Sequence, residues 1–265
     1  MKKYILLSMA FLLFVVGGFA ILNNKVTKEQ SKMVELNVSA AASLKDVLGE
    51  IKTLYEKDNP NVKIVYNFGA SGNLRNQIEQ GANVDIFISA AVNHMNELEK
   101  QGFVKKEDRK NLVENDLVLI KSKNNVINNQ NFEVLLDENV KKIAMGEPKG
   151  VPAGQYALQV CEKLNLWDKI KDKIVFASDV RSVLAYVETE NVDLGMVYKT
   201  DAFISDKVDV IATAPKNSHE PILYPLAIVN KQNVKKESKS FFEYLLSDDS
   251  KDIFRKYGFE IPGEI

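Results

Sequence analysis

Four short segments of the chain contain the residue types that can bind an anion without a positively charged side chain. Serine hydroxyls donate hydrogen bonds, and glycine and alanine let a ligand approach backbone amides closely. The four segments run from Ser39 to Ser43, from Gly69 to Asn73, from Gly150 to Gly154 and from Ser178 to Arg181. Any one of them could serve only to cap a helix, but together they predict a site for an oxyanion.

Each segment precedes a stretch whose apolar residues have helical spacing. A helix N-terminus exposes amides that lack an acceptor and carries a partial positive charge, so it attracts oxyanions. Ser43 and Asp46 have the spacing of a capping box, which predicts that the Ser43 side chain caps the helix after it. Pro152 suits the first turn of the third helix.

Short apolar runs with strand character alternate with the helices. Strands are predicted at 34–38, 62–66, 84–88, 117–120, 141–145, 174–176, 193–197 and 208–211, and one last helix at 238–257. Such alternation is typical of an α/β protein with parallel sheets. In open α/β sheets, ligands bind at the carboxyl ends of the strands, where helices begin. The predicted fold therefore places all four segments at the carboxyl ends of strands, where ligands bind in such sheets.

The sequence contains no recognisable catalytic or metal-binding constellation. Cys161 is the only cysteine, and its helical spacing with Ala157 and Leu164 indicates a buried small side chain. His94 and His219 are far apart and lack the spacing of metal ligands. We therefore expect no catalytic residue and no resident cofactor, and the protein is not expected to be an enzyme.

The charge balance and the N-terminus restrict the location and the partners. The formal net charge is -1, which offers no basic field for nucleic acid. Residues 1–32 begin with two lysines and an apolar run from Tyr4 to Leu22, which predicts an export signal or an uncleaved membrane anchor, followed by a tether. A lipoprotein would need a cysteine just after that run, and none is present.

Several motifs together resemble a known family. They are AAASL at 40–44, FGASGNLRNQIEQGANVDIFISA at 68–90, GEPKGVPAGQYA at 146–157, SDVRSVLAYVE at 178–188, VDLGMVYKTDA at 192–202 and KYGFEIP at 256–262. In this order they resemble the molybdate-binding component of bacterial ABC importers, a class of extracytoplasmic solute-binding proteins. The resemblance extends from about residue 34 to the end of the chain.

The resemblance implies a two-lobed α/β fold of the periplasmic-binding-protein type II, with crossing strands at the hinge. Lobe I would comprise 33–115 and 222–265, and lobe II 116–221. The anion contacts implied are the hydroxyls of Ser43, Ser71 and Tyr198 and the backbone amides of Ala153 and Val180. Molybdenum or tungsten would be present at these residues only as the oxyanion. Ala70 and Gly72 flank Ser71 where the family often has further hydroxyls.

The resemblance also implies partners and a location. The ligand would be molybdate or tungstate, and the partners would be an ABC permease in the membrane and its ATPase. We expect an extracytoplasmic monomer that binds no nucleic acid. Molybdate and tungstate are nearly the same size, so the sequence does not separate them.

Three alternatives stay open at this point. The same fold could bind sulfate, phosphate or an organic anion, and Arg75 or Arg181 near a helix start could clamp a carboxylate. A phosphate proton would need an acceptor such as Asp46, Asp179 or Asp201, which we expect to cap helices and face away from the site. An enzyme on a similar scaffold would need a base or a nucleophile in the cleft. The effector domain of a transcription regulator would carry a helix-turn-helix in place of the leader.

Overall fold

The structure is a computed structural model that describes residues 33–127 and 130–263. The chain divides into two units, Met1–Met33 and Val34–Ile265, and the second is the compact body described below. The predicted export signal or anchor at 1–32 lies outside the described residues. Among the described residues, no helix is both long and apolar enough to cross a membrane.

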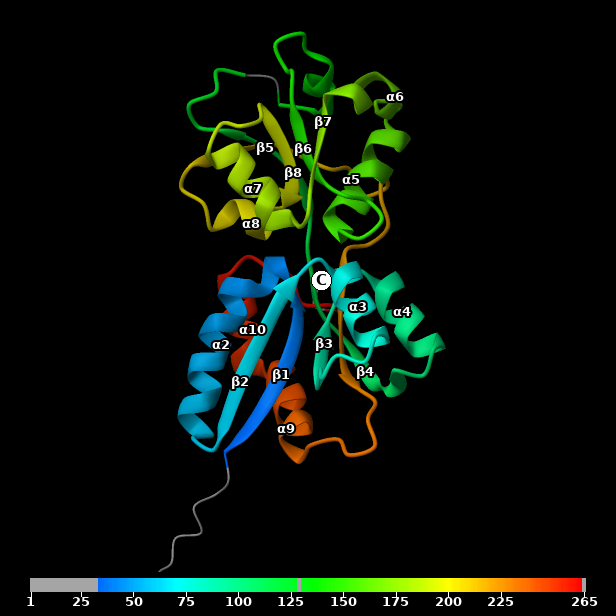
Figure 1. The fold of residues 1–265 in the computed structure, drawn as a ribbon. Coiled ribbons are helices and arrows are strands. Elements are labelled where there is room, and N and C mark those ends of the chain that lie inside the picture. The colour runs from blue at the N-terminus through cyan, green and yellow to red at the C-terminus, as the bar shows by residue number, and fades with distance from the viewer. Residues whose placement is uncertain (1–32, 128–129, 264–265) are drawn as a thin grey trace, which may run out of the picture. The chain divides into compact units, whose positions relative to one another are not determined.

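Sheet A forms the centre of one lobe, here called lobe I (Figure 1). Its strands are β1 (Val34–Ala41), β2 (Val62–Gly69), β3 (Ile86–Ile88), β4 (Val104–Glu114) and β10 (Leu223–Val229), in the order β2-β1-β3-β10-β4. β1 is parallel to β2 and β3, whereas β10 is antiparallel to β3 and β4. The three parallel strands therefore end at the same edge.

Sheet B forms the centre of lobe II (Figure 1). Its strands are β5 (Leu117–Ser122), β6 (Ile143–Gly146), β7 (Ile174–Ala177), β8 (Leu194–Tyr198) and β9 (Val208–Thr213), in the order β7-β6-β8-β5-β9. β6 is parallel to β7 and β8, and β5 is antiparallel to β8 and β9. In each sheet four strands thus run in one direction, and a single strand, β10 in sheet A and β5 in sheet B, runs in the opposite direction.

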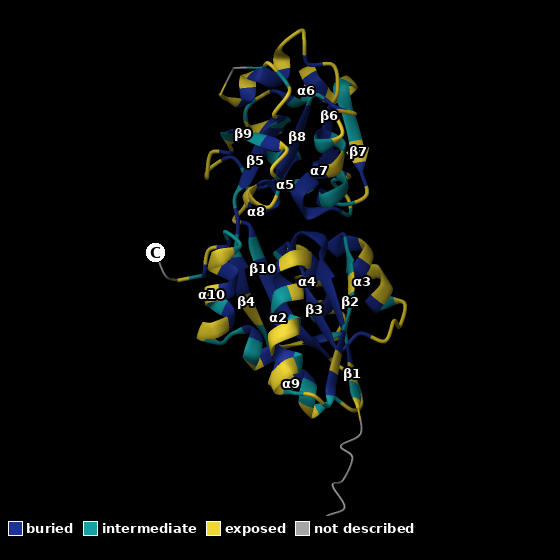
Figure 2. Ribbon diagram, turned by 90° about the vertical axis from the view of Figure 1, so that its left-hand side faces the viewer, coloured by how far each residue is buried: buried dark blue, intermediate teal, exposed yellow. Residues whose placement is uncertain are grey.

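Helices pack on both sheets. They are α2 (Lys45–Asp58), α3 (Ser71–Glu79), α4 (Val92–Lys100), α5 (Pro152–Lys163), α6 (Trp167–Ile170), α7 (Val180–Glu188), α8 (Lys199–Phe203), α9 (Lys236–Leu245) and α10 (Asp248–Lys256), with 3-10 turns η1 (Ala42–Leu44), η2 (Phe132–Leu136) and η3 (Lys171–Lys173). Their apolar faces are buried and their outer faces are exposed (Figure 2). This amphipathic pattern is how a helix stabilises a sheet layer.

The lobes are joined where the chain leaves one sheet for the other. β4 is followed by Asn115 and Asp116 before β5 begins, and residues 214–222 return the chain from β9 to β10. The lobes are also in direct contact, because the Gly72 amide at the start of α3 donates to the Gly150 carbonyl before α5 over 2.9 Å. The two-lobed α/β fold expected from the sequence is confirmed, while the predicted lobe boundaries stay a prediction.

The predicted parallel pairing is found for β1, β2 and β3 and for β6, β7 and β8, but β4 and β10 were missed, and β10 and β5 run antiparallel to their neighbours. β10 contains Pro225, which normally argues against a central strand because it cannot donate a ladder hydrogen bond. The strand tolerates it at a shift in register between Tyr224 and Pro225. β4 is an edge strand with a largely charged middle, so it lacks the apolar pattern of a buried strand.

The single helix predicted at 238–257 is two helices. α9 ends at Leu245 and α10 begins at Asp248. Between them Ser247 donates from its hydroxyl to the Tyr244 carbonyl over 2.7 Å and accepts from the Ser250 amide over 3.3 Å. A serine that caps a new N-terminus while closing the previous turn ends one helix and starts the next, although the apolar spacing continues through both.

Candidate functional site

The carboxyl ends of six parallel strands position the residues that the sequence singled out. In lobe I, β1 ends just before η1 with Ser43, β2 leads into α3 with Ser71, and β3 leads to Ala90. In lobe II, β6 precedes α5 with Ala153, β7 precedes α7 with Val180, and Tyr198 is the last residue of β8. The same end of each parallel set therefore supplies the candidate site, as expected for α/β sheets.

These residues surround one small, tightly closed cavity between the lobes. Its lining contains all five residues predicted to contact an anion, together with small neighbours: Ala41, Ala42, Ser43, Gly69, Ala70, Ser71, Ala90, Val151, Pro152, Ala153, Asp179, Val180 and Tyr198. No lysine, arginine or histidine is among these lining residues. The structure thus brings the predicted residues together from both lobes, and their role in binding stays a prediction.

The Ser43 hydroxyl is oriented by a chain of hydrogen bonds. The side-chain oxygen Oδ1 of Asn115 accepts from the Asp116 backbone amide over 2.9 Å, and the side-chain nitrogen Nδ2 donates to Thr200 Oγ1 over 2.8 Å and to Tyr224 Oη over 3.3 Å. Tyr224 Oη lies 3.0 Å from Ser43 Oγ. Because Tyr224 accepts from Asn115, its own proton can go to Ser43, which leaves the Ser43 proton free for the cavity.

The predicted capping role of Ser43 was wrong. Ser43 lies in the middle of the 3-10 turn η1, and α2 begins two residues later with no side-chain hydrogen bond at its cap residue Leu44. The tighter turn carries the Ser43 side chain toward Tyr224 and the cavity. Asp46 is in the first turn of α2, but its carboxylate binds Arg181.

Ser71 begins α3 and is fully buried. Its hydroxyl oxygen accepts a hydrogen bond from the Ala90 amide over 2.9 Å, which fixes the side-chain direction and leaves the hydroxyl proton available. The cap residue Ala70 has no side-chain acceptor for the first amides of the helix. The Gly72 amide donates to the Gly150 carbonyl, so the start of α3 combines the Ser71 hydroxyl with the uncapped amide of Ser71 itself.

Tyr198 contributes a buried hydroxyl without a partner. Its side chain is 1% exposed, and within the described part of the chain its Oη atom makes no hydrogen bond, although the Tyr224 side chain lies beside it with the ring centroids 5.7 Å apart. Burial raises the pKa of Tyr198 well above its ordinary value, so the hydroxyl keeps its proton at neutral pH. A buried polar group without a partner is costly, and this one lies in the cavity wall.

The two remaining predicted contacts are backbone amides at helix starts. Pro152 is the first residue of α5 and has no N–H group, so Ala153 provides the first amide, and Val151 offers no side-chain cap. At α7, the Asp179 side chain accepts from the Ser182 amide over 2.9 Å, which leaves the amide of Val180 uncapped. Both amides lack an intrahelical acceptor and lie at the positive end of a helix.

Close backbone approach explains the glycine at the end of VPAG. A Cβ atom on Gly154 would come within 1.9 Å of the Gly146 carbonyl oxygen at the end of β6. Only glycine lets the first turn of α5 lie this close to the strand. The position of the Ala153 amide therefore depends on this pair of glycines.

The charged groups near the cavity are already paired with one another. Arg181 Nη2 lies 2.6 Å from Asp46 Oδ2, and Arg181 Nε lies 2.7 Å from Asp201 Oδ1. Asp179 caps α7 and also accepts from the Ser178 and Ser182 hydroxyls. The expectation that these aspartates cap helices is confirmed for Asp179 and wrong for Asp46 and Asp201, which bind a guanidinium. The expectation that they face away from the site is wrong for Asp179, which lines the cavity, whereas Asp46 and Asp201 are not among the lining residues.

Arg75, the other arginine considered as a clamp for a carboxylate ligand, does not line the cavity. Arg75 pairs with Glu79 at 3.3 Å and lies 3.5 Å from His94 Nδ1. Burial, together with the nearby Arg75, lowers the pKa of His94 to about 4. His94 is thus a neutral side chain of the lobe I interior, and Cys161 is a fully buried side chain of α5 whose pKa burial raises to about 12.

Sequence reasoning missed Tyr224, Asn115 and Ala90, which orient the two serines. Nothing in their spacing indicates the role. Tyr224 precedes the unusual strand proline, and Asn115 lies in the connection between the lobes. Among the described residues, no group of three or more His, Cys, Asp or Glu side chains is placed to hold a metal ion.

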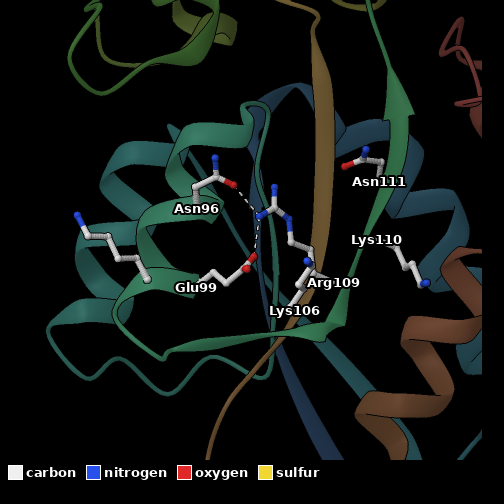
Figure 3. A pocket seen from close by; sticks show the side chains of 7 residues that line it. Asn96, Glu99, Lys106, Arg109, Lys110 and Asn111 are labelled. Carbon is white, nitrogen blue, oxygen red and sulfur yellow. Dashed lines mark hydrogen bonds and ion pairs between the residues drawn. The ribbon is translucent and has the colours of Figure 1, made fainter.

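A second, larger pocket of about 600 Å³ lies between α4 and β4 and is open to solvent. It is lined by Asn96, Glu99, Lys100, Lys106, Arg109, Lys110 and Asn111. Figure 3 shows Arg109 directed at Asn96 and Glu99, to which it donates over 2.7 and 2.9 Å. This pocket has the positive charge that the small cavity lacks.

Two α/β lobes around a small, donor-rich cavity without a cationic side chain in its lining define a ligand-binding protein of the two-lobed solute-binding class. The family model of bacterial extracellular solute-binding proteins matches residues 36–260. The chain therefore belongs to this family, which is a family of binding proteins and not of enzymes.

Similarity to individual proteins agrees with the family. The chain is 46% identical over 259 residues to YvgL of Bacillus subtilis, named as an ABC transporter substrate-binding lipoprotein, with 97% of this chain and 98% of that protein covered. It is 39% identical over 262 residues to the molybdate-binding protein ModA of Haemophilus influenzae, with 98% and 99% covered. The solved periplasmic molybdate-binding protein of Azotobacter vinelandii superposes with a TM-score of 0.78 at 25% identity, covering 86% of this chain and 99% of that one.

Proposed function

We propose that this protein captures molybdate or tungstate outside the cytoplasm and delivers it to an ABC permease and its ATPase. The observation that carries the proposal is the buried hydroxyl of Tyr198, which has no partner among the described residues and faces a cavity with further donors. An oxyanion bound there would accept from Ser43, Ser71 and Tyr198 and from the amides of Ala153 and Val180. No resident cofactor is needed for this activity.

Neutral donors suit a dianion that can only accept hydrogen bonds. Each hydrogen bond to a charged partner contributes about 1.5–3 kcal/mol, so several together exceed the roughly 8 kcal/mol of a micromolar complex. The excess offsets the loss of the anion's hydration and the closure of the lobes. Charge repulsion is limited because the nearby carboxylates of Asp46 and Asp201 are paired with Arg181.

The groups that line the cavity also support a preference for molybdate over phosphate and sulfate. Protonated phosphate needs an acceptor, and the Asp179 carboxylate at the cavity is already occupied by the Ser182 amide and two hydroxyls. Sulfate has the same charge as molybdate, so discrimination must come from the size of the cavity. Molybdate and tungstate are expected to bind alike.

The proposed location rests on the family and on the names of the relatives. The Bacillus subtilis relative is named a lipoprotein, but the single cysteine of this chain, Cys161, is buried in α5. Attachment through a lipidated cysteine therefore does not transfer to this chain. The apolar N-terminal segment is proposed as the export signal or anchor, and the protein as a monomer.

Calorimetric titration with molybdate, tungstate, sulfate and phosphate tests the proposal. We expect molybdate and tungstate to bind with similar affinity and the other two much more weakly. Tyr198→Phe removes one donor to the anion and should weaken molybdate binding by roughly 10- to 150-fold. Preferred binding of sulfate or phosphate, or unchanged molybdate affinity in Tyr198→Phe, would contradict it.

A further inference from the structure

Arg181 stands immediately beside the proposed anion site without lining it. It follows Val180 at the start of α7, and it is absent from the residues that line the cavity. Its side chain is 21% exposed and its guanidinium binds oxygen atoms of three other residues. A cation next to an anion site that is committed to other groups needs an explanation other than direct binding.

The three partners of Arg181 come from different lobes. Within lobe II, Nε lies 2.7 Å from the carboxylate of Asp201, which is 0% exposed. Toward lobe I, Nη2 lies 2.6 Å from Asp46 Oδ2 and 3.2 Å from the Ser43 carbonyl oxygen. The Asp201 contact is independent of how the lobes are arranged, whereas the Asp46 and Ser43 contacts exist only when the lobes are together.

We propose that Arg181 is a latch residue that holds the lobes closed around the bound oxyanion by capturing Asp46 and the Ser43 carbonyl. This inference rests on the proposed function. Asp201 holds the guanidinium in lobe II, so little side-chain freedom is lost when lobe I arrives. The contact to the Ser43 carbonyl connects the latch to a residue of the site itself.

The latch also balances charge where the anion binds. Asp46 is in the first turn of α2, close in sequence to Ser43, and its negative charge would oppose a bound dianion. In the closed arrangement the guanidinium lies against Asp46 as well as Asp201. Opening separates Asp46 from Arg181 and restores that repulsion, so the same pair slows release while closed and favours it once open.

The geometry requires an arginine. The planar guanidinium presents Nε to one carboxylate and Nη2 to the other lobe, while a lysine has a single nitrogen at the end of its chain. Arg181→Lys is therefore expected to keep the Asp201 pair and lose the contacts to lobe I.

The test compares two neutralised carboxylates on the same helix. Asp46→Asn removes the pair between the lobes, whereas the matched control Glu50→Gln removes a pair inside lobe I, between Glu50 and Lys256 at 2.8 Å. Dissociation of molybdate is followed by stopped-flow chase with tungstate. We expect Asp46→Asn to raise the dissociation rate by roughly 3- to 10-fold with a smaller change in association, and Glu50→Gln to stay within about twofold.

A double-mutant cycle separates a latch from a general structural role. Removing Arg181 alone would leave Asp201 buried without its cation, so Arg181→Gln is combined with Asp201→Asn. In that background Asp46→Asn should no longer change the dissociation rate, because its partner is gone. An equal effect of Asp46→Asn in both backgrounds, or an equal effect of Glu50→Gln, overturns the latch.

Small-angle X-ray scattering distinguishes failure of the latch from failure of the proposed function. The radius of gyration is measured without anion and with molybdate, tungstate, sulfate or phosphate. If molybdate does not bind but another anion closes the protein, the proposed ligand is wrong, and Asp46→Asn should still shift that closure toward the open form. If Asp46→Asn leaves the radius of gyration unchanged under every condition, the latch is overturned whatever the ligand.

Discussion

The small cavity between the lobes and the open pocket between α4 and β4 could each attract an anion, but they would do so through different chemical groups. The pocket is larger and carries Lys100, Lys106, Arg109 and Lys110, whereas the cavity has no cationic side chain in its lining. In the pocket, water competes for every charge, and Arg109 already binds Glu99. In the cavity, the donors are buried and oriented before any ligand arrives.

The comparison teaches that oriented neutral donors are better evidence of an anion site than positive charge. A desolvated hydroxyl such as that of Tyr198 gains more from an oxyanion than an exposed ammonium that is fully hydrated and screened by salt. Net charge is accordingly a poor guide to this protein, whose formal charge is -1.

The largest effect is expected from removing both serine hydroxyls of the cavity. The double variant Ser43→Ala with Ser71→Ala removes two charge-assisted hydrogen bonds and should weaken molybdate binding by at least about 100-fold in calorimetry. It also leaves the Ala90 amide and Tyr224 hydroxyl with one partner fewer, so thermal unfolding is measured in parallel. Molybdate affinity like that of the wild type in a folded double variant would refute the assignment of the site.

A smaller loss of molybdate affinity is expected when the hydrogen-bond donors of the cavity are kept but closure of the two lobes is obstructed. A Cβ atom on Gly72 would lie 2.8 Å from the Gly150 Cα and carbonyl oxygen of the other lobe. Gly72→Ala should therefore weaken molybdate binding by roughly tenfold without lowering the unfolding temperature, because overpacking at this contact is felt only when the lobes meet.

Gly49→Ala is the matched control, since nothing lies within 4 Å of the Cβ it would add to α2. It should leave the affinity unchanged and raise stability slightly, because alanine favours a helix by about 1 kcal/mol relative to glycine. Equal affinities of Gly72→Ala and the wild type would show that the contact between Gly72 and Gly150 is not needed for binding.

The buried carboxyl group of Asp201 is expected to have a modest effect on stability. Burial raises the pKa of Asp201 from 3.8 to about 6, although Arg181 opposes the shift. The folded state thus holds the proton more tightly than the unfolded chain, so this contribution to stability is complete below 3.8 and is lost as the pH rises through about 6.

Asp201→Asn should remove this dependence. The free energy of unfolding of the wild type relative to the variant is expected to fall between about pH 4 and about pH 6, as measured by denaturant titration at several pH values. If the free energy of unfolding of the wild type relative to the variant instead rises over this pH range, the ion pair with Arg181 outweighs burial and keeps the pKa of Asp201 low.

The smallest effect is expected in the basic pocket. Lys106→Ala combined with Lys110→Ala removes two exposed charges that line it, and molybdate affinity should stay within about twofold at physiological salt. A large loss of affinity in this variant, measured by the same calorimetry, would show that positive charge outside the cavity contributes to anion capture.

The local features of the site follow from short stretches of sequence. Strand ends followed by small residues and helix starts predicted where anions could bind, and the five residues inferred from the family motifs lie around one cavity. Local sequence is sufficient here because uncapped amides at a helix start depend on a few consecutive residues, such as Val151, Pro152 and Ala153. The predicted binding role of these residues awaits the experiments above.

The orientation of these local features depends instead on contacts between residues that are far apart in the chain. Ser43 was expected to cap its own helix, but its hydroxyl bonds to Tyr224, 181 positions away in the chain. Asp46 was expected to complete the same cap, but it binds Arg181, 135 positions away. Neither partner can be found from spacing, because each contact depends on how two distant strands are placed by sheet pairing and by the meeting of the lobes.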